Sequence, residues 1–316
     1  MIKKLFYLVK PLIPRSFQIL LRRSLIRKQR IKYKDVWPIF KSSELKPENW
    51  KGWPGNKKFA FILTHDVELQ SGHDKCLKLA LLEKELGFVS SFNFVPERYN
   101  VSAELRNELV KEGFEVGVHG LKHDGKLFSS KKIFDERAKE INKYIKQWSV
   151  TGFRAPAMHH NLEWILDLNI KYDLSTFDTD PFEPQADGMK TIFPFRVISK
   201  EGTQGYWEFP YTLVQDFTLF ILMQEKNIDI WTQKLDWIAE KGGMALVNVH
   251  PDYLCFEGKA GQEEFPVQHY LNLLKYVKNK YAGQFLNILP HNLALEMDLL
   301  LKPNLIKEKI LYNNTD

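Results

Sequence analysis

Short apolar runs alternate along this chain with longer segments in which apolar residues recur every three or four positions. The short runs predict β-strands, and the periodic segments predict amphipathic helices. The expected strands are 58–64, 91–95, 115–118, 151–155, 173–177 and 244–249, and the expected helices are 74–86, 102–112, 131–148, 162–168 and 228–241. Alternation of this kind is typical of parallel βαβ units, so we expect an α/β fold.

Residues 180–212 interrupt the alternation with a stretch rich in Pro, Gly and aromatic side chains, and we expect it to cover or shape the mouth of a site. The whole chain has 316 residues, of which 44% are hydrophobic and 27% charged, which suffices for one large core. We therefore expect a leader and linker over 1–57, a barrel-sized domain over 58–300 and a tail over 301–316.

Positive charge is concentrated at the start of the chain. The first 34 residues contain 11 Lys and Arg and no Asp or Glu, which leaves 34 basic against 39 acidic residues in the remainder. Apolar residues interleave with the basic ones, so residues 1–34 predict a basic amphipathic segment. It either contacts an anionic membrane surface or packs on the barrel or on a partner, and the sequence leaves both open. No nucleic-acid arm is expected, because the apolar residues exceed what phosphate contact requires.

The sequence also bears on the compartment. Lys10, Pro11 and Pro14 interrupt the apolar stretch of the leader, so we expect no signal peptide. No apolar run approaches the roughly 20 residues that cross a bilayer. Cys76 and Cys255 do not make a disulfide framework. We expect a cytoplasmic protein, peripheral at the cytoplasmic membrane face if the leader binds lipid.

Candidate metal ligands occur in two segments. His119 and His123 follow a strand-like run and lie between turn-forming glycines, and imidazoles at this spacing can bind one divalent ion. Asp66 and Glu68 end the first expected strand, where residues two apart point to the same side. One carboxylate with two imidazoles would leave coordination positions for water and substrate.

Other reactive side chains end further strands of the expected sheet. Arg154, Asp178 and His250 all fall at carboxyl ends. In parallel sheets and barrels, chemistry gathers at that edge. We therefore expect these side chains to share one site with the candidate metal ligands.

Four segments, in this order, resemble the polysaccharide deacetylase family, also called the NodB-homology or carbohydrate esterase family 4 group. They are Thr64-His-Asp-Val-Glu68, the pair His119 and His123, Gly152-Phe-Arg-Ala-Pro156, and Ala245-Leu-Val-Asn-Val-His250-Pro-Asp. The resemblance runs from about Lys58 to about Pro290. It implies a distorted (β/α)7 barrel with a basic amino-terminal extension, and one divalent metal ion, with zinc first and cobalt, nickel or iron as alternatives.

The resemblance also implies roles for individual residues. Asp66 corresponds to the catalytic base and His250 to the general acid. Arg154 corresponds to the residue that orients the base, and His119 and His123 to the metal-binding pair. The family usually has two adjacent aspartates where this chain has Asp66, Val67 and Glu68. Glu68 is the candidate metal carboxylate, with a plain loop carboxylate as the alternative. His65 should face away from Asp66, as a packed or solvent-exposed histidine and not a fourth ligand.

The remaining assignments concern the acid histidine and the substrate. Asp173, Asp178 and Asp180 compete for the aspartate that tunes the acid, and we favour Asp178 because it ends an apolar strand. We expect Pro156 and Trp207 to contact substrate, Trp207 by stacking on a sugar.

Together these features predict a metal-dependent hydrolase that removes an N-acetyl or related acyl group from an amino sugar of a glycan, in surface-polysaccharide assembly. Two alternatives stay open. The same fold can hydrolyse non-sugar C–N bonds such as those of cyclic ureides, or the chain is a catalytically silent sugar-binding barrel. Release of acetate and metal content would discriminate among the three.

Overall fold

The structure is a computed structural model that describes residues 14–48, 50–185 and 187–301. A nine-stranded sheet forms its centre. Its strands are β1 (Phe59–Val67), β2 (Ser90–Phe94), β3 (Glu115–His119), β4 (Gly152–Arg154), β5 (Tyr172–Asp173), β6 (Phe195–Ile198), β7 (Gly205–Glu208), β8 (Met244–Asn248) and β11 (Phe285–Leu286). A separate pair joins β9 (Leu254–Cys255) to β10 (Phe265–Pro266).

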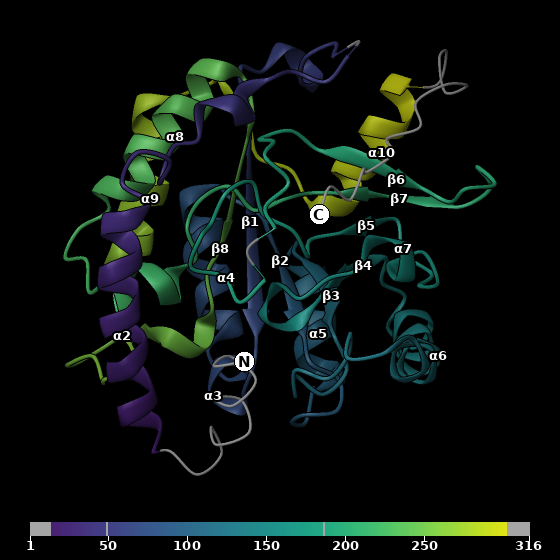
Figure 1. Cartoon of the computed structure of the whole chain (residues 1–316), viewed down its shortest axis with the longest axis horizontal. Helices are drawn as coiled ribbons and strands as arrows, with labels where there is room; N and C mark the ends of the chain where they lie inside the picture. Colours follow the sequence, from purple (N-terminus) through teal and green to yellow (C-terminus); the bar gives the residue numbers. More distant parts are fainter. Residues whose placement is uncertain (1–13, 49, 186, 302–316) are drawn as a thin grey trace.

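The sheet is parallel except for β6, which runs antiparallel to β7, and β1 lies between β8 and β2 (Figure 1). One course runs β1, β2, β3, β4, β5 and β7, while β8 pairs with β1 separately. The residues after β7 connect the two ends. The Tyr211 amide donates to the Thr176 carbonyl at 2.9 Å, and the Thr212 amide donates to the Leu246 carbonyl of β8 at 3.0 Å. The expected distorted (β/α) barrel is therefore confirmed.

Helices lie on both sides of this sheet (Figure 1). They are α2 (Arg15–Lys32), α3 (Gln70–His73), α4 (Cys76–Leu86), α5 (Ala103–Lys111), α6 (Lys131–Trp148), α7 (Leu162–Ile165), α8 (Asp229–Lys241), α9 (Val267–Lys280) and α10 (Pro290–Leu301). Short 3-10 helical turns are η2 (Lys41–Glu44), η3 (Pro54–Asn56), η4 (Pro156–Met158) and η6 (Pro251–Tyr253). The segment η5 (Phe217–Leu222) is a π-helix. Across 14–301, none of the described helices combines the length and apolarity that spanning a bilayer demands.

Local sequence explains where the helices around the sheet begin and which face they bury. The Ser102 and Ser130 hydroxyls accept hydrogen bonds from backbone amides three residues later, which caps α5 and α6. The buried residues of α6 recur at helical spacing and pack on the sheet; they are Phe134, Ala138, Ile141 and Ile145. Every residue of β1 is buried, as expected for a central parallel strand.

The structure adds detail to two segments outside the regular alternation. Much of the stretch 180–212 builds the sheet, because it contains β6, β7 and the link to β8. The part of the leader within α2 packs on the barrel through Ile19 and Ile26, which are buried. Residues 1–13 of the leader, and 302–316 of the tail, lie outside the described residues.

Candidate active site

Strand β1 brings two carboxylates to its carboxyl end. Asp66 lies within the strand and Glu68 directly follows it. The Asp252 carboxylate accepts hydrogen bonds from the Glu68 and Leu69 amides at 2.8 and 2.9 Å. These bonds fix the turn after β1, so Glu68 is held close to Asp66.

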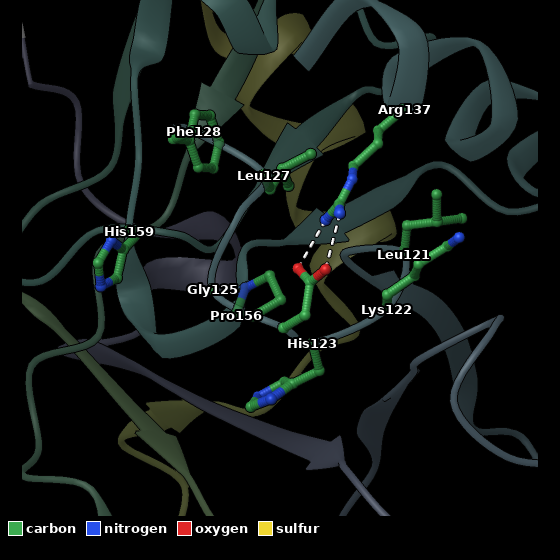
Figure 2. A pocket seen from close by; sticks show the side chains of 10 residues that line it. Leu121, Lys122, His123, Gly125, Leu127, Phe128, Arg137, Pro156 and His159 are labelled. Carbon is green, nitrogen blue, oxygen red and sulfur yellow. Dashed lines mark hydrogen bonds and ion pairs between the residues drawn. The ribbon is translucent and has the colours of Figure 1, made fainter. Parts of the chain in front are cut away.

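The loop after β3 carries both histidines and needs unusual backbone. Gly120 and His123 have φ of 60° and 53°, in the left-handed region. A Cβ on Gly120 would lie 2.5 Å from atoms of the Pro156 ring, so only glycine fits there. Beyond His123, the Asp124 carboxylate accepts two hydrogen bonds from Arg137 of α6, both at 2.7 Å (Figure 2). This ion pair ties the loop to α6.

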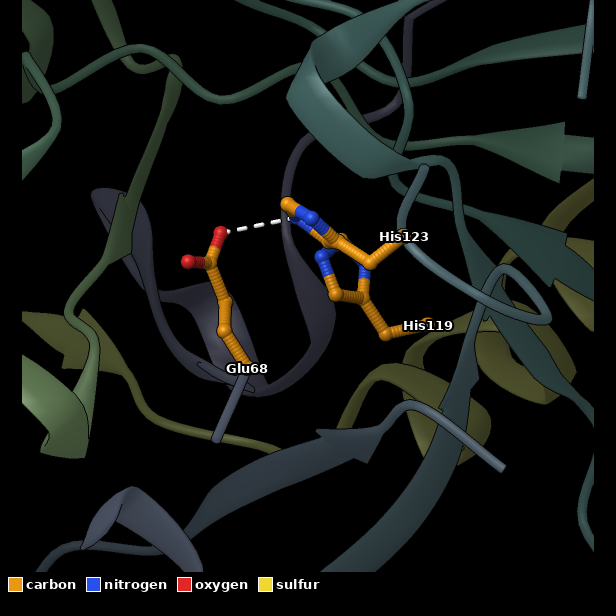
Figure 3. Close-up of side chains that lie close together, drawn as sticks. All are labelled: Glu68, His119 and His123. Atoms are coloured by element: carbon orange, nitrogen blue, oxygen red, sulfur yellow. Dashed lines mark ion pairs between the residues drawn. The ribbon is translucent and has the colours of Figure 1, made fainter. Parts of the chain in front are cut away.

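Glu68, His119 and His123 converge (Figure 3). One ligand atom from each residue lies within 4.8 Å of the others, and His123 Nε2 is 2.9 Å from Glu68 Oε1. His119 Nδ1 lies 3.1 Å from the Arg154 carbonyl, so this nitrogen carries the proton and donates. Its Nε2 is buried and has no hydrogen-bond partner among the described residues. Two imidazoles and a carboxylate with such an unsatisfied nitrogen suit a divalent metal ion.

The protonation of His119 and Glu68 fits that use. Burial lowers the pKa of His119 to about 4, against the opposing charge of Asp66, so the imidazole is neutral at pH 7. Burial would raise the pKa of Glu68, but the neighbouring His123 outweighs it and holds that pKa well below the usual range. The Tyr253 hydroxyl donates to the other Glu68 oxygen at 2.9 Å. Glu68 is therefore an ionised, oriented carboxylate.

Asp66 lies beside this cluster among hydrogen-bond donors. Its Oδ1 accepts from Asn93 at 3.1 Å and from Arg154 at 3.2 Å, and its Oδ2 accepts from Asn248 at 2.8 Å. Burial would raise its pKa, but the Arg154 charge, with His119, His250 and the Asn93 bond, lowers that pKa to about 2. Asp66 is thus ionised at neutral pH and fixed in direction.

His250 follows β8 and has a carboxylate behind it. Its Nδ1 lies 2.7 Å from Asp216 Oδ1, and its backbone amide donates to the other Asp216 oxygen at 2.7 Å. Burial would lower the pKa of His250, but the Asp216 charge and hydrogen bond, with Glu68 and Asp66, raise that pKa to about 10. Asn248 Nδ2, which donates to Asp66, is also 3.5 Å from His250 Nε2. His250 is therefore a protonated imidazolium next to Asp66.

The structure does not place Asp178 beside His250. Asp178 is fully buried and pairs with the Lys234 ammonium, whose Nζ is 2.9 and 2.8 Å from the two carboxylate oxygens. Burial raises the pKa of Asp178 to about 6 despite that ammonium. Asp216 occupies the place that we expected for Asp178.

The two residues that we expected to contact substrate lie in different surroundings. Trp207 is 3% exposed, its indole NH donates to Asp298 at 2.8 Å, and its ring packs in the core beneath the Arg196 guanidinium. It offers no free ring face to a sugar, so the structure contradicts the stacking role. Pro156 follows β4 and lines a pocket together with His123 (Figure 2). His65 packs as expected, between the Val249 carbonyl at 2.7 Å and Glu83 at 2.8 Å.

Sequence reasoning missed several polar residues of the site. Asn248 precedes His250 by two positions on an apolar strand, and Asn93 interrupts the aromatic run of β2, so strand periodicity could have indicated both. Tyr253 and Asp252 follow His250 closely. Asp216 has no such signal, because it precedes η5 in a segment without strand or helix pattern.

Comparisons with known proteins bear on the fold. No family model matches the chain, and no curated protein matches it. Among solved structures, a protein of Mycobacterium smegmatis assigned as a polysaccharide deacetylase is similar, with a TM-score of 0.61, 15% identity, and coverage of 81% of this chain and 95% of that one. One from Pseudomonas aeruginosa PAO1 with the same assignment gives 0.59, 14%, 81% and 95%. Puue allantoinase gives 0.60, 14%, 78% and 92%. The resemblance to polysaccharide deacetylases is thus confirmed at the level of the fold.

Proposed function

We propose that this chain is a metal-dependent amide hydrolase that removes an N-acetyl or related acyl group from an amino sugar of a glycan. One observation carries the proposal. Three side chains that could ligate a metal ion, an ionised aspartate and a protonated histidine gather at the carboxyl ends of β1, β3 and β8. Those are the parts that amide hydrolysis requires.

Glu68, His119 and His123 would hold the metal ion. A divalent ion bound there would supply Lewis acidity, which makes water nucleophilic at neutral pH and stabilises negative charge on a carbonyl oxygen. Nitrogen and oxygen donors of this kind suit zinc, with cobalt, nickel and iron as alternatives.

Asp66 would act as the general base. Its carboxylate is ionised at neutral pH and can accept the proton of the attacking water. Asn93, Arg154 and Asn248 hold its oxygens in place. Arg154 is in turn oriented through its Nε, which donates to the Leu174 carbonyl at 2.9 Å. Arg154 is thus a positioning residue in this scheme.

His250 would act as the general acid. Because Asp216 accepts from Nδ1, the proton on Nε2 is free to pass to the departing amine nitrogen. The ion pair with Asp216 keeps the imidazolium charged until that transfer. Asp66 and His250 therefore divide the work of proton acceptor and proton donor.

The glycan substrate is supported by the shared fold with two structures assigned as polysaccharide deacetylases. Similarity to Puue allantoinase supports ureide hydrolysis as the second candidate, with the same residues acting on a different C–N bond. For the compartment we propose the cytoplasm, since both cysteines are free and Cys76 is buried, which suits reducing conditions.

The decisive experiment incubates the zinc-loaded full chain with soluble N-acetylated oligosaccharides and measures acetate release, and in parallel measures allantoin turnover. We expect acetate release that a chelator abolishes and zinc restores. Turnover of allantoin alone would establish ureide hydrolysis as the function. Sugar binding that persists with chelator, without turnover of either compound, would establish a silent barrel.

A further inference from the structure

Helix α2 has two apolar faces, one buried against the barrel and one exposed. Its inner face contacts the barrel, where Ile19 and Ile26 are 1% and 4% exposed. Its outer face is also apolar, since Phe17, Leu20 and Leu25 are each more than half exposed, at 53%, 54% and 56%. Large side chains exposed this far along one helix mark an interaction site.

Contacts with the barrel fix how α2 is turned. The Arg23 Nε donates to the Ile221 carbonyl of η5 at 2.8 Å, and the Arg22 guanidinium lies 5.0 Å from the centre of the Phe217 ring. Arg30 pairs with Glu225 farther along. The helix therefore cannot rotate its outer residues inward without losing these contacts.

The outer face combines apolar and basic side chains. At 100° per residue, its exposed members fall within less than half of the helix circumference. They are Phe17, Leu20, Leu21, Ser24, Leu25, Lys28, Ile31 and Lys32. Exposed Arg27 borders them, and α2 contains no acidic residue. We call this set the outer face of α2.

We propose that the outer face of α2 docks on an anionic lipid bilayer. Apolar side chains would enter the boundary between headgroups and acyl chains, while Arg27, Lys28 and Lys32 lie among anionic headgroups. The charge of the helix is complementary to such a surface. In contrast, the rest of the chain after residue 34 has more acidic than basic residues, so the attraction is specific to this end.

A second copy of the chain fits this face less well. One face of an 18-residue helix measures about 27 Å by about 10 Å, or about 270 Å², whereas a stable interface needs about 800 Å² per partner. Two such faces would also bring like charges together.

Docking would orient the candidate active site. Helix α2 contacts η5, and Asp216, which caps η5, accepts from His250. In Figure 1 the amino end of α2 and helix α3, which follows the carboxyl end of β1, lie toward the same end of the molecule. If the proposed function holds, the site is thereby presented to a glycan attached to lipid. Docking itself does not rest on that function.

The test is co-sedimentation of the full chain with vesicles of equal parts phosphatidylglycerol and phosphatidylcholine, with pure phosphatidylcholine vesicles for comparison. We expect binding to the mixed vesicles that weakens as salt increases. The triple variant Leu20→Gln, Leu21→Gln, Leu25→Gln should bind at least about tenfold less. The control variant Leu45→Gln, Leu81→Gln, Val110→Gln alters apolar residues elsewhere that are at least as exposed on average, and it should bind like the parent chain.

Three results would overturn the docking proposal. They are equal loss in both triple variants, equal binding to the two vesicle types, and dimerisation in place of vesicle binding, measured by sedimentation velocity. Turnover of soluble oligosaccharide is measured on the same samples. Vesicle binding without turnover would refute the proposed function and leave docking intact, and turnover without vesicle binding would do the reverse.

Discussion

Two buried aspartates, each beside a cationic side chain, differ in pKa. Asp66 lies next to Arg154, and although burial would raise its pKa, the surrounding charges lower that pKa to about 2. Asp178 lies next to Lys234, and burial raises its pKa to about 6. Because both are buried, a nearby cation alone does not decide the outcome.

The surroundings of the carboxylate make the difference. The pKa of Asp66 is lowered by the charges of Arg154, His119 and His250 and by the hydrogen bond from Asn93, whereas Asp178 has the charge of Lys234 in its favour and that of Asp180 against it. Several cationic neighbours around one buried carboxylate keep it ionised, which suits a reacting group. The Asp178 pair suits packing between neighbouring segments.

The largest expected effect separates the two aspartates by activity. Asp66→Asn keeps the shape but removes the proton acceptor, so we expect kcat to fall about 10³-fold. Asp178→Asn should leave kcat within about threefold of the parent, because Asp178 touches no reacting group. Both are measured by acetate release at matched metal content. Equal losses in the two variants would remove the distinction.

The next effect concerns stability. Lys234→Met leaves Asp178 buried without its cation, and we expect the free energy of unfolding to fall by about 3 kcal/mol. The double variant Lys234→Met, Asp178→Leu removes the unpaired acid and should recover most of that loss. Denaturant unfolding measures both. If the double variant is as unstable as the single one, packing and not charge explains the effect.

A smaller effect is expected from the ion pair between Asp216 and the proposed general acid, His250. Asp216→Asn removes the negative charge that raises the pKa of His250 to about 10. The protonated imidazole is the active form, so activity is lost as pH rises through that pKa. In the variant the alkaline limb of the profile of kcat against pH should move to lower pH, with kcat at pH 7 reduced about tenfold. An unmoved limb would show that Asp216 does not tune the acid.

The smallest effect concerns Trp207. Trp207→Phe removes the hydrogen bond to Asp298 and should cost about 1 kcal/mol of unfolding free energy. KM for the oligosaccharide should not change, since the ring is buried. A rise of several-fold in KM at unchanged kcat would indicate that Trp207 does contact the sugar.

Periodicity predicted the barrel well because each strand and helix buries its own local pattern. The strand expected at 58–64 is β1, and the helix expected at 131–148 is α6 with the same bounds. The closure of the sheet, in which residues after β7 link the end of β5 to β8, was not predicted. It depends on hydrogen bonds of residues 211 and 212, which have no regular pattern of their own.

The site was predictable where its residues sit at strand ends within short motifs, as with Glu68, His119 and His123, which the structure brings together. Asp216 was not, because its role depends on how η5 is placed against β8 through tertiary packing. The predicted sugar-stacking role of Trp207 was wrong for a related reason. Its position in an aromatic-rich stretch says nothing about which side of the sheet its ring occupies.

The metal content of the purified chain tests the central claim most directly. After loading with zinc and exhaustive dialysis, mass spectrometry of the metal should give about one ion per chain in the parent and in both Asp66→Asn and Asp178→Asn. His119→Ala should retain far less, because one of three ligands is gone. A parent chain that retains no zinc, cobalt, nickel or iron, or a His119→Ala variant that retains as much as the parent, would contradict the account.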